Sequence, residues 1–200
     1  MKDTIIQKIS NRITRSRYGS VFFVSSFSDF DEEYITKLLS EFEKQGLIVR
    51  ISKGVYVKAK KTRFGYVYPS AYELAGEIAK RDHAKVIPTG EAAANLLGFS
   101  TQVPMNTTFL TTGSARKIAL GKRTITMKHG APKNFAYQGT LVPQLVQALR
   151  SIGQGNITPE VEKRISVLLS NTPECNTIEH DILLAPVWIR NLIRKSITSE

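Results

Sequence analysis

The sequence predicts an α+β protein, with an N-terminal winged helix-turn-helix followed by a mixed α/β domain that ends in a helical tail. The first observation is an amphipathic segment at Asp31–Gln45, followed by a glycine and two short β-branched segments with a basic turn. That is the order in which a winged helix-turn-helix ends. The second is that β-prone and helical segments alternate after residue 63. The third is a hydrophobic content of 42% in 200 residues, enough for one large packed domain or two small ones.

The chain begins with a predicted amphipathic helix that extends to about Ser16. Its isoleucines recur at helical spacing, at Ile5, Ile6, Ile9 and Ile13. Gly19 ends this segment, and the residues at 21–24 are β-prone. Ser25 or Ser26 then caps a helix of one or two turns.

The next predicted helix covers Glu32–Gln45 and would be the recognition helix. Asp31 is a suitable N-terminal cap. A single apolar stripe follows at i, i+3, i+4 and i+7, formed by Ile35, Leu38, Leu39 and Phe42. Gly46 ends the helix. Strands at 47–51 and 55–57 then flank the turn Ser52-Lys53-Gly54, which would be the wing.

A domain boundary is predicted near Thr62–Tyr68, which gives domains at residues 1–63 and 64–200. The expected helices of the second domain are Pro69–Asp82, a short one capped by Thr89 and ending at Gly98, Leu141–Gly153, Pro159–Ser170 and Ala185–Ser196. The expected strands are Lys85–Pro88, Thr107–Thr112, Arg116–Leu120 and Arg123–Lys128. Residues 99–105 and 173–177 are expected to be irregular.

The charge of the chain favours a polyanionic partner. The formal net charge is +11, and residues 1–63 hold 13 Lys or Arg against 7 Asp or Glu. Together with the winged helix this predicts double-stranded DNA as the partner. The alternative is a basic protein whose charge has no specific partner.

The candidate DNA-binding residues lie on three parts of the first domain. Most are expected to contact phosphates, whereas Thr36, Lys37 and Ser40 would face base edges or phosphates. The set is Arg12, Arg15, Arg17, Thr36, Lys37, Ser40, Lys44, Arg50, Lys53, Lys58, Lys60, Lys61 and Arg63. The acidic start of the helix, at Asp31, Glu32 and Glu33, would repel phosphates. It leaves open a winged helix used for protein contact or as a scaffold.

Three further segments carry a resemblance to a known family. They are VIPTGEAAANLLGFSTQVP at Val86–Pro104, FLTTGSARKIALGKRTITMKH at Phe109–His129 and LVPQLVQALR at Leu141–Arg150. With the winged helix before them, they make residues 17–150 similar to the AbiEi-like antitoxin and transcriptional-regulator family of type IV toxin–antitoxin systems.

This resemblance implies a bipartite protein without enzymatic activity or cofactor. The winged helix would bind inverted repeats in the promoter of its own operon and repress it. The second domain would be the antitoxin against a nucleotidyltransferase-like toxin, whose effect it would oppose without necessarily forming a stable complex. The alternative is a winged-helix regulator or interaction module without antitoxin activity.

A candidate partner surface lies in the second domain. Pro88-Thr89-Gly90 would hold an anion at a helix start or would only cap a packed helix. A basic stripe on the strands, which also includes Lys128 and Lys133, would extend the DNA surface, meet another partner or be a solvated face. The candidate residues are Thr89, Ser100, Thr101, Gln102, Arg116, Lys117, Lys122 and Arg123.

Other site types find little support in the sequence. The three histidines, His83, His129 and His180, are far apart and no cysteine pair exists, so no metal site is expected. An enzyme acting on nucleic acid is a third hypothesis, and the lack of clustered carboxylates counts against it. Cys175 is the only cysteine, which suits a reducing compartment. No membrane-spanning run or signal peptide is recognised, so we expect a cytoplasmic protein.

Overall fold

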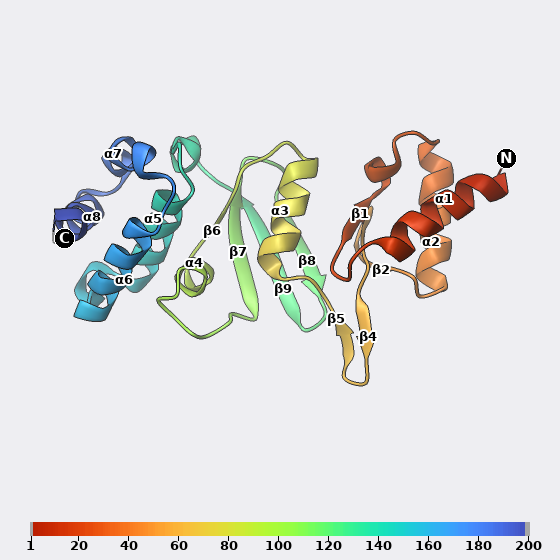
Figure 1. Ribbon diagram of the computed structural model, residues 1–200, viewed down its shortest axis with the longest axis horizontal. Coiled ribbons are helices and arrows are strands. Elements are labelled where there is room, and N and C mark those ends of the chain that lie inside the picture. The colour runs from red at the N-terminus through yellow and green to blue at the C-terminus, as the bar shows by residue number, and fades with distance from the viewer. Residues whose placement is uncertain (1, 199–200) are drawn as a thin grey trace. The chain divides into compact units, whose positions relative to one another are not determined.

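The computed structural model describes residues 2–198 and has an α+β fold (Figure 1). The chain forms two compact units. The first contains the chain up to Glu77 together with Ile118–Thr124, and the second contains Ile78–Lys117 and the chain from Ile125 onward. These units are groupings in space, and the domain boundary after Arg63 stays a prediction.

The first unit is built on a small antiparallel sheet with two helices. Its elements are α1 (Lys2–Arg15), β1 (Val21–Phe23), the 3₁₀ turn η1 (Val24–Phe27), α2 (Glu32–Lys44), β2 (Val49–Ser52), β3 (Val55–Val57), β4 (Lys60–Thr62), β5 (Gly65–Val67) and the first part of α3 (Ala71–Arg81). The strand order is β1-β3-β2. Because β3 is the central strand, all three of its residues are buried.

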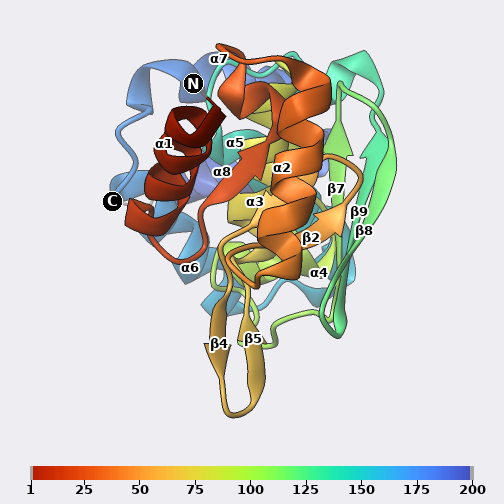
Figure 2. The same cartoon turned by 90° about the vertical axis from the view of Figure 1, so that its right-hand side faces the viewer.

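The core of this unit confirms the predicted apolar stripes. Ile9 and Ile13 of α1 pack with Phe22, Phe27 and the four buried residues of α2, Ile35, Leu38, Leu39 and Phe42. Both helices can be followed in Figure 2. The Asp31 carboxylate accepts the backbone N–H of Tyr34 at 2.8 Å, which confirms the predicted cap.

A second hairpin, β4–β5, follows the first. It pairs Lys60 with Val67, Lys61 with Tyr66 and Thr62 with Gly65. The sequence does not predict these strands, since their lysines and threonine lack the apolar alternation that marks a half-buried strand. Figures 1 and 2 both show its turn extending away from α1, α2 and the three-stranded sheet of the same unit.

Helix α3 begins with a reciprocal capping box. The Ser70 hydroxyl accepts the N–H of Glu73 at 3.2 Å, and the Glu73 carboxylate accepts the N–H of Ser70 at 2.8 Å. These hydrogen bonds, from the backbone and then the side chain of Ser70, lower the pKa of Glu73.

The second unit joins a sheet to a group of helices. Its elements are the rest of α3, β6 (Val86–Pro88), α4 (Glu91–Leu96), β7 (Asn106–Thr111), β8 (Arg116–Leu120) and β9 (Arg123–His129) except for their residues within Ile118–Thr124, η2 (Pro132–Phe135), α5 (Leu141–Ile152), η3 (Gln154–Asn156), α6 (Pro159–Ser170), α7 (Cys175–Leu184) and α8 (Val187–Thr198). The sheet order is β6-β7-β9-β8. A core shared by α4–α8 includes Leu145, Leu149, Ile165, Ile182 and Ile189.

The start of α5 is held by two acidic side chains from the segment 174–181. Glu174 accepts hydrogen bonds from the backbone N–H groups of Thr140 and Leu141 at 2.8 and 3.0 Å and from the Thr140 hydroxyl at 2.7 Å. The buried Asp181 accepts the N–H groups of Gln138 and Gly139 at 2.9 and 2.8 Å. Burial acts to raise the pKa of Glu174, but the hydrogen bonds from Thr140 and Leu141 outweigh it and lower that pKa.

Several predicted details of the second unit are wrong. Gly90, with φ of 60°, is the N-cap of α4, and the Thr89 hydroxyl instead donates to the Thr108 carbonyl at 3.1 Å. The predicted break at 173–177 contains the start of α7, whose buried apolar residues in the described part of the helix, Ile178 and Ile182, are too few to form a clear stripe. The last helix begins at Val187 rather than at Ala185.

Among the helices of residues 2–198, none combines the length and the apolar character needed to cross a membrane.

Candidate nucleic-acid interface

The outward face of α2 is polar, and part of it is engaged in local contacts. Thr36 and Lys37 are exposed. The Lys37 ammonium pairs with the Glu33 carboxylate at 2.7 Å, one helical turn before it. The Ser40 hydroxyl donates to the Thr36 carbonyl at 2.9 Å. Lys44 lies exposed in the last turn, next to Glu43 and one helical turn from Glu41.

The turn between β2 and β3 presents two basic side chains. Arg50 and Lys53 are both exposed. The strand register shifts between Arg50 and Ser52, and the Arg50 Nε donates to the Ser52 carbonyl at 3.4 Å. Gly54, with φ of 69°, supplies the left-handed conformation that this tight turn needs. The two charges are therefore carried by a short hairpin whose other strand is the buried centre of the sheet.

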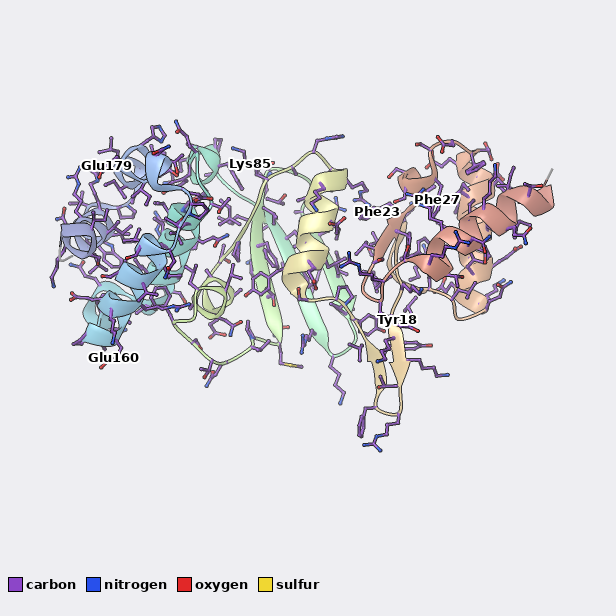
Figure 3. All side chains as sticks on the ribbon, in the orientation of Figure 1. Tyr18, Phe23, Phe27, Lys85, Glu160 and Glu179 are labelled. Atoms are coloured by element: carbon purple, nitrogen blue, oxygen red, sulfur yellow. The ribbon has the colours of Figure 1, made fainter. Side chains whose placement is uncertain are left out.

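Two of the predicted DNA-binding residues have their charged groups engaged within the fold. The Lys58 ammonium donates to the carbonyls of Thr14 and Ser16 at 2.5 and 2.8 Å and lies 5.2 Å from the ring centroid of Tyr18, which Figure 3 labels. It thereby satisfies carbonyls at the C-terminal end of α1.

Arg12 has a comparable role. Its guanidinium donates to the Ser26 carbonyl at 2.7 Å and lies 4.9 Å from the ring centroid of Phe27, so it holds η1 to α1. Sequence spacing does not show either contact, because each joins segments that are distant in the chain.

The remaining arginines after α1 differ in their surroundings. Arg15 and Arg17 are both exposed. Arg17, however, lines a groove of about 660 Å³ together with Lys60, Glu73 and Glu77. Since this groove carries charges of both signs, it is a weaker site for a polyanion than the hairpin beside it.

The β4–β5 hairpin carries the other predicted basic residues. Lys60, Lys61 and Arg63 are all exposed. The Arg63 guanidinium lies 4.6 Å from the ring centroid of Phe64 at the turn. From Lys44 to Tyr72 the chain contains seven Lys or Arg and no Asp or Glu. The absence of acidic residues from this segment is the sequence feature that identifies both hairpins as one basic region.

In the second unit the candidate partner residues do not form one site. Thr101 and Gln102 are exposed in a loop where the Ser100 hydroxyl accepts the Gln102 N–H at 3.2 Å. Gly98 has a positive φ of 75°, which favours glycine, and a Cβ there would also lie 2.7 Å from the Arg164 guanidinium, which donates to the Leu97 carbonyl. Gly90, the N-cap of α4, likewise has a positive φ of 60°, a conformation that glycine adopts without steric cost. The capped-helix interpretation therefore accounts for both glycines.

The basic stripe on the strands is partly neutralised. Lys117, Lys122 and Arg123 are exposed. Arg116 instead pairs with Asp82 at 2.6 Å, and Arg81 pairs with the same carboxylate at 2.7 Å. Burial acts to raise the pKa of Asp82, but the hydrogen bonds and charges of these two arginines outweigh it and lower that pKa.

No group of three or more His, Cys, Asp or Glu side chains among the described residues is arranged to hold a metal ion.

The model of a family of unknown function, DUF6088, matches residues 8–177. The chain belongs to the DUF6088 family. No curated protein matches the chain. The match covers most of both units and continues past residue 150, so the helices α6 and the start of α7 are part of what defines the family.

Proposed function

We propose that this DUF6088 protein binds double-stranded DNA through a winged helix-turn-helix formed by α1 to β3 and represses its own operon. The observation that carries the proposal is the sheet order β1-β3-β2, in which the strand after α1 pairs with the second strand of the hairpin after α2. This topology supports a winged helix with η1 and α2 as the helix-turn-helix.

The distribution of charge supports the wing as the main source of affinity. The start of α2 is acidic, with Asp31 used as the cap and Glu33 paired to Lys37. Arg50 and Lys53, in contrast, lie within the segment that lacks acidic residues. Phosphate contacts by the wing would position α2, whose Thr36 and Ser40 offer only short polar groups to base edges.

We test this with the double variant Arg50→Ala/Lys53→Ala, using a short duplex from the region upstream of the gene. Loss of two phosphate contacts should weaken binding to every duplex and flatten the dependence of log K on log salt by about 1.8, at −0.9 per phosphate. Affinity is measured by fluorescence anisotropy over a series of salt concentrations.

The matched control is Arg150→Ala/Lys163→Ala, which removes the same charge from exposed positions on α5 and α6. Its salt dependence should equal that of the parent. A double wing variant that binds like the parent would remove the wing from the proposal. A parent protein that binds no duplex at low salt would overturn DNA binding itself.

The antitoxin role is the second part of the proposal. Its support is the resemblance carried by Val86–Pro104, which covers β6, α4 and the loop after them. The partner would be a nucleotidyltransferase-like toxin encoded in the same operon, opposed with or without direct contact. Co-expression should restore growth in cells that express the neighbouring gene. Restored growth with the DNA-binding variant, and no restoration with an empty vector, would separate this role from repression.

A further inference from the structure

The β4–β5 hairpin ends in a two-residue turn made of Arg63 and Phe64. The register, which pairs Thr62 with Gly65, leaves only these two residues outside the ladder. The Thr62 hydroxyl accepts the N–H of Phe64 at 3.2 Å and donates to the Gly65 carbonyl at 2.8 Å. The turn is therefore fixed by a side chain of its own strand.

The base of the hairpin is also fixed within the first unit. The rings of Tyr66 and Tyr68 lie 6.2 Å apart, centroid to centroid, in a tilted arrangement. A Cβ at Gly121, in the part of the β8–β9 connection that belongs to the same unit, would lie 3.2 Å from the Tyr68 ring. The hairpin is thus held at its base, while Figures 1 and 2 show its turn extending away from α1, α2 and the three-stranded sheet of the same unit.

The tip exposes a large apolar group between positive charges. Phe64 is 87% exposed, the highest value among the large hydrophobic residues of the described chain. Tyr66 and Val67 on the returning strand are 42% and 54% exposed. Arg63 lies against the Phe64 ring, and Lys60 and Lys61 lie on the strand that leads to the turn. Burial of an exposed aromatic side chain against a partner is favourable. The positive charges beside Phe64 favour a polyanion as that partner.

We propose that Phe64 is a wedge that enters the minor groove of duplex DNA and separates two stacked base pairs, while Arg63 and the two lysines contact the flanking phosphates. Apolar wedges on basic supports kink DNA in this way. The minor groove is about 6 Å wide, so the part that would enter it is the Phe64 ring at the end of the turn and not the paired strands. The inference rests on the proposed function, which supplies the duplex that the hairpin would engage.

The test compares Phe64→Ala with the parent on the upstream duplex. Bending is measured by energy transfer between dyes at the two ends, and unstacking by the fluorescence of 2-aminopurine placed at successive steps. The parent should kink the duplex by roughly 20–90° and brighten 2-aminopurine at one step. Phe64→Ala should abolish both signals and lower affinity by about tenfold, with an unchanged salt slope because no phosphate contact is lost.

Three further variants make the outcome specific. Phe64→Leu should retain part of the bend, since leucine is also an effective wedge. Lys61→Ala/Arg63→Ala should flatten the salt slope, and Val187→Ala, which shortens another exposed apolar residue on α8, should change nothing. A duplex bent equally by the parent and by Phe64→Ala would overturn the wedge while leaving DNA binding intact.

A Phe64→Ala defect confined to single-stranded DNA would overturn the wedge as well, because it would make Phe64 a stacking platform for unpaired bases. Absence of duplex binding by the parent would instead remove the proposed function, so the two failures are distinguishable.

Discussion

Lys53 and Lys58 lie on the same hairpin segment, yet their surroundings give them different roles. Lys53 is exposed at the turn, with its ammonium free to face a phosphate. The Lys58 ammonium lies between two carbonyls at the end of α1 and the face of Tyr18. A charge engaged in this way contributes to the position of α1 on the sheet.

We therefore expect Lys58→Ala to lower the stability of the fold. Removing the ammonium leaves the Thr14 and Ser16 carbonyls without their donor, which should lower the free energy of unfolding by about 1–2 kcal/mol. Urea denaturation followed by circular dichroism measures the change. Lys60→Ala, at an exposed position two residues later, is the control and should change stability by less than about 0.5 kcal/mol. Equal stability of the two variants would contradict a structural role for Lys58.

At the scale of elements, the start of α5 depends on Glu174, which lies 34 residues after Thr140 in the chain. Its first N–H groups have no partner within the helix, and Thr140, its N-cap, offers no side-chain cap. The Glu174 carboxylate supplies the missing acceptor. An acidic group at this end is also favoured by the helix dipole.

This arrangement predicts an acid-dependent stability. The folded-state pKa of Glu174 lies below its ordinary value of 4.5, so its contribution is complete above that pH and is lost as pH falls through the folded pKa. Glu174→Gln should lower the free energy of unfolding by about 1–3 kcal/mol near pH 7. The difference from the parent should narrow as the pH falls below the ordinary value of 4.5 and through the lowered pKa of Glu174. Thermal unfolding at a series of pH values measures it.

The control for this prediction is Glu179→Gln, at an exposed position on α7 that Figure 3 labels. The difference in stability between Glu179→Gln and the parent should stay nearly constant across the same pH range. A Glu174→Gln difference that stays the same from pH 7 to pH 3 would show that the amide loses packing rather than charge-assisted hydrogen bonds.

Elements with a strong local signal could be predicted from the sequence, and those fixed by distant contacts could not. Helix α2 has a cap, a stripe and a terminal glycine within sixteen residues of sequence, Asp31–Gly46, and its bounds agree with the prediction to one residue. The β4–β5 hairpin has no apolar alternation, and α7 has little amphipathic pattern, so neither was predictable.

The same distinction applies to the candidate site. The position of a basic side chain in an exposed turn, such as that of Lys53, can be predicted from the local sequence pattern. The carbonyl contacts of Lys58 and the pairing of Arg116 with Asp82 depend on residues 34 to 44 positions away in the chain. Sequence spacing gives no information on such contacts, and they decide which cations remain available.

For the whole molecule, the division into two compact units separates the proposed DNA contact from the rest of the chain. The segment α1–β3, which is the proposed winged helix, and the β4–β5 hairpin belong to the first unit, whereas α5–α8 belong to the second. A ligand that binds only the folded state stabilises what it touches.

Duplex DNA at 100 times its dissociation constant should therefore add about 2.7 kcal/mol to the stability of the unit that binds it. Hydrogen exchange read by mass spectrometry should show increased protection in peptides of α1–β3 and β4–β5, and little change in α5–α8. A scrambled duplex at high salt serves as the control. Protection gained first in α5–α8 would place the contact on the second unit and contradict the proposal.

The close approach around Gly139 limits which side chain this position can hold. A Cβ at position 139 would lie 2.6 Å from a Glu174 carboxylate oxygen and 2.7 Å from the Thr177 hydroxyl. A methyl group at position 139 would therefore displace the Glu174 carboxylate from the N–H groups that it accepts at the start of α5. The family match ends at residue 177, just beyond Glu174. The helices after that point still take part in the fold, since Asp181 accepts the N–H groups of Gln138 and Gly139, and Ile189 belongs to the core shared by α4–α8.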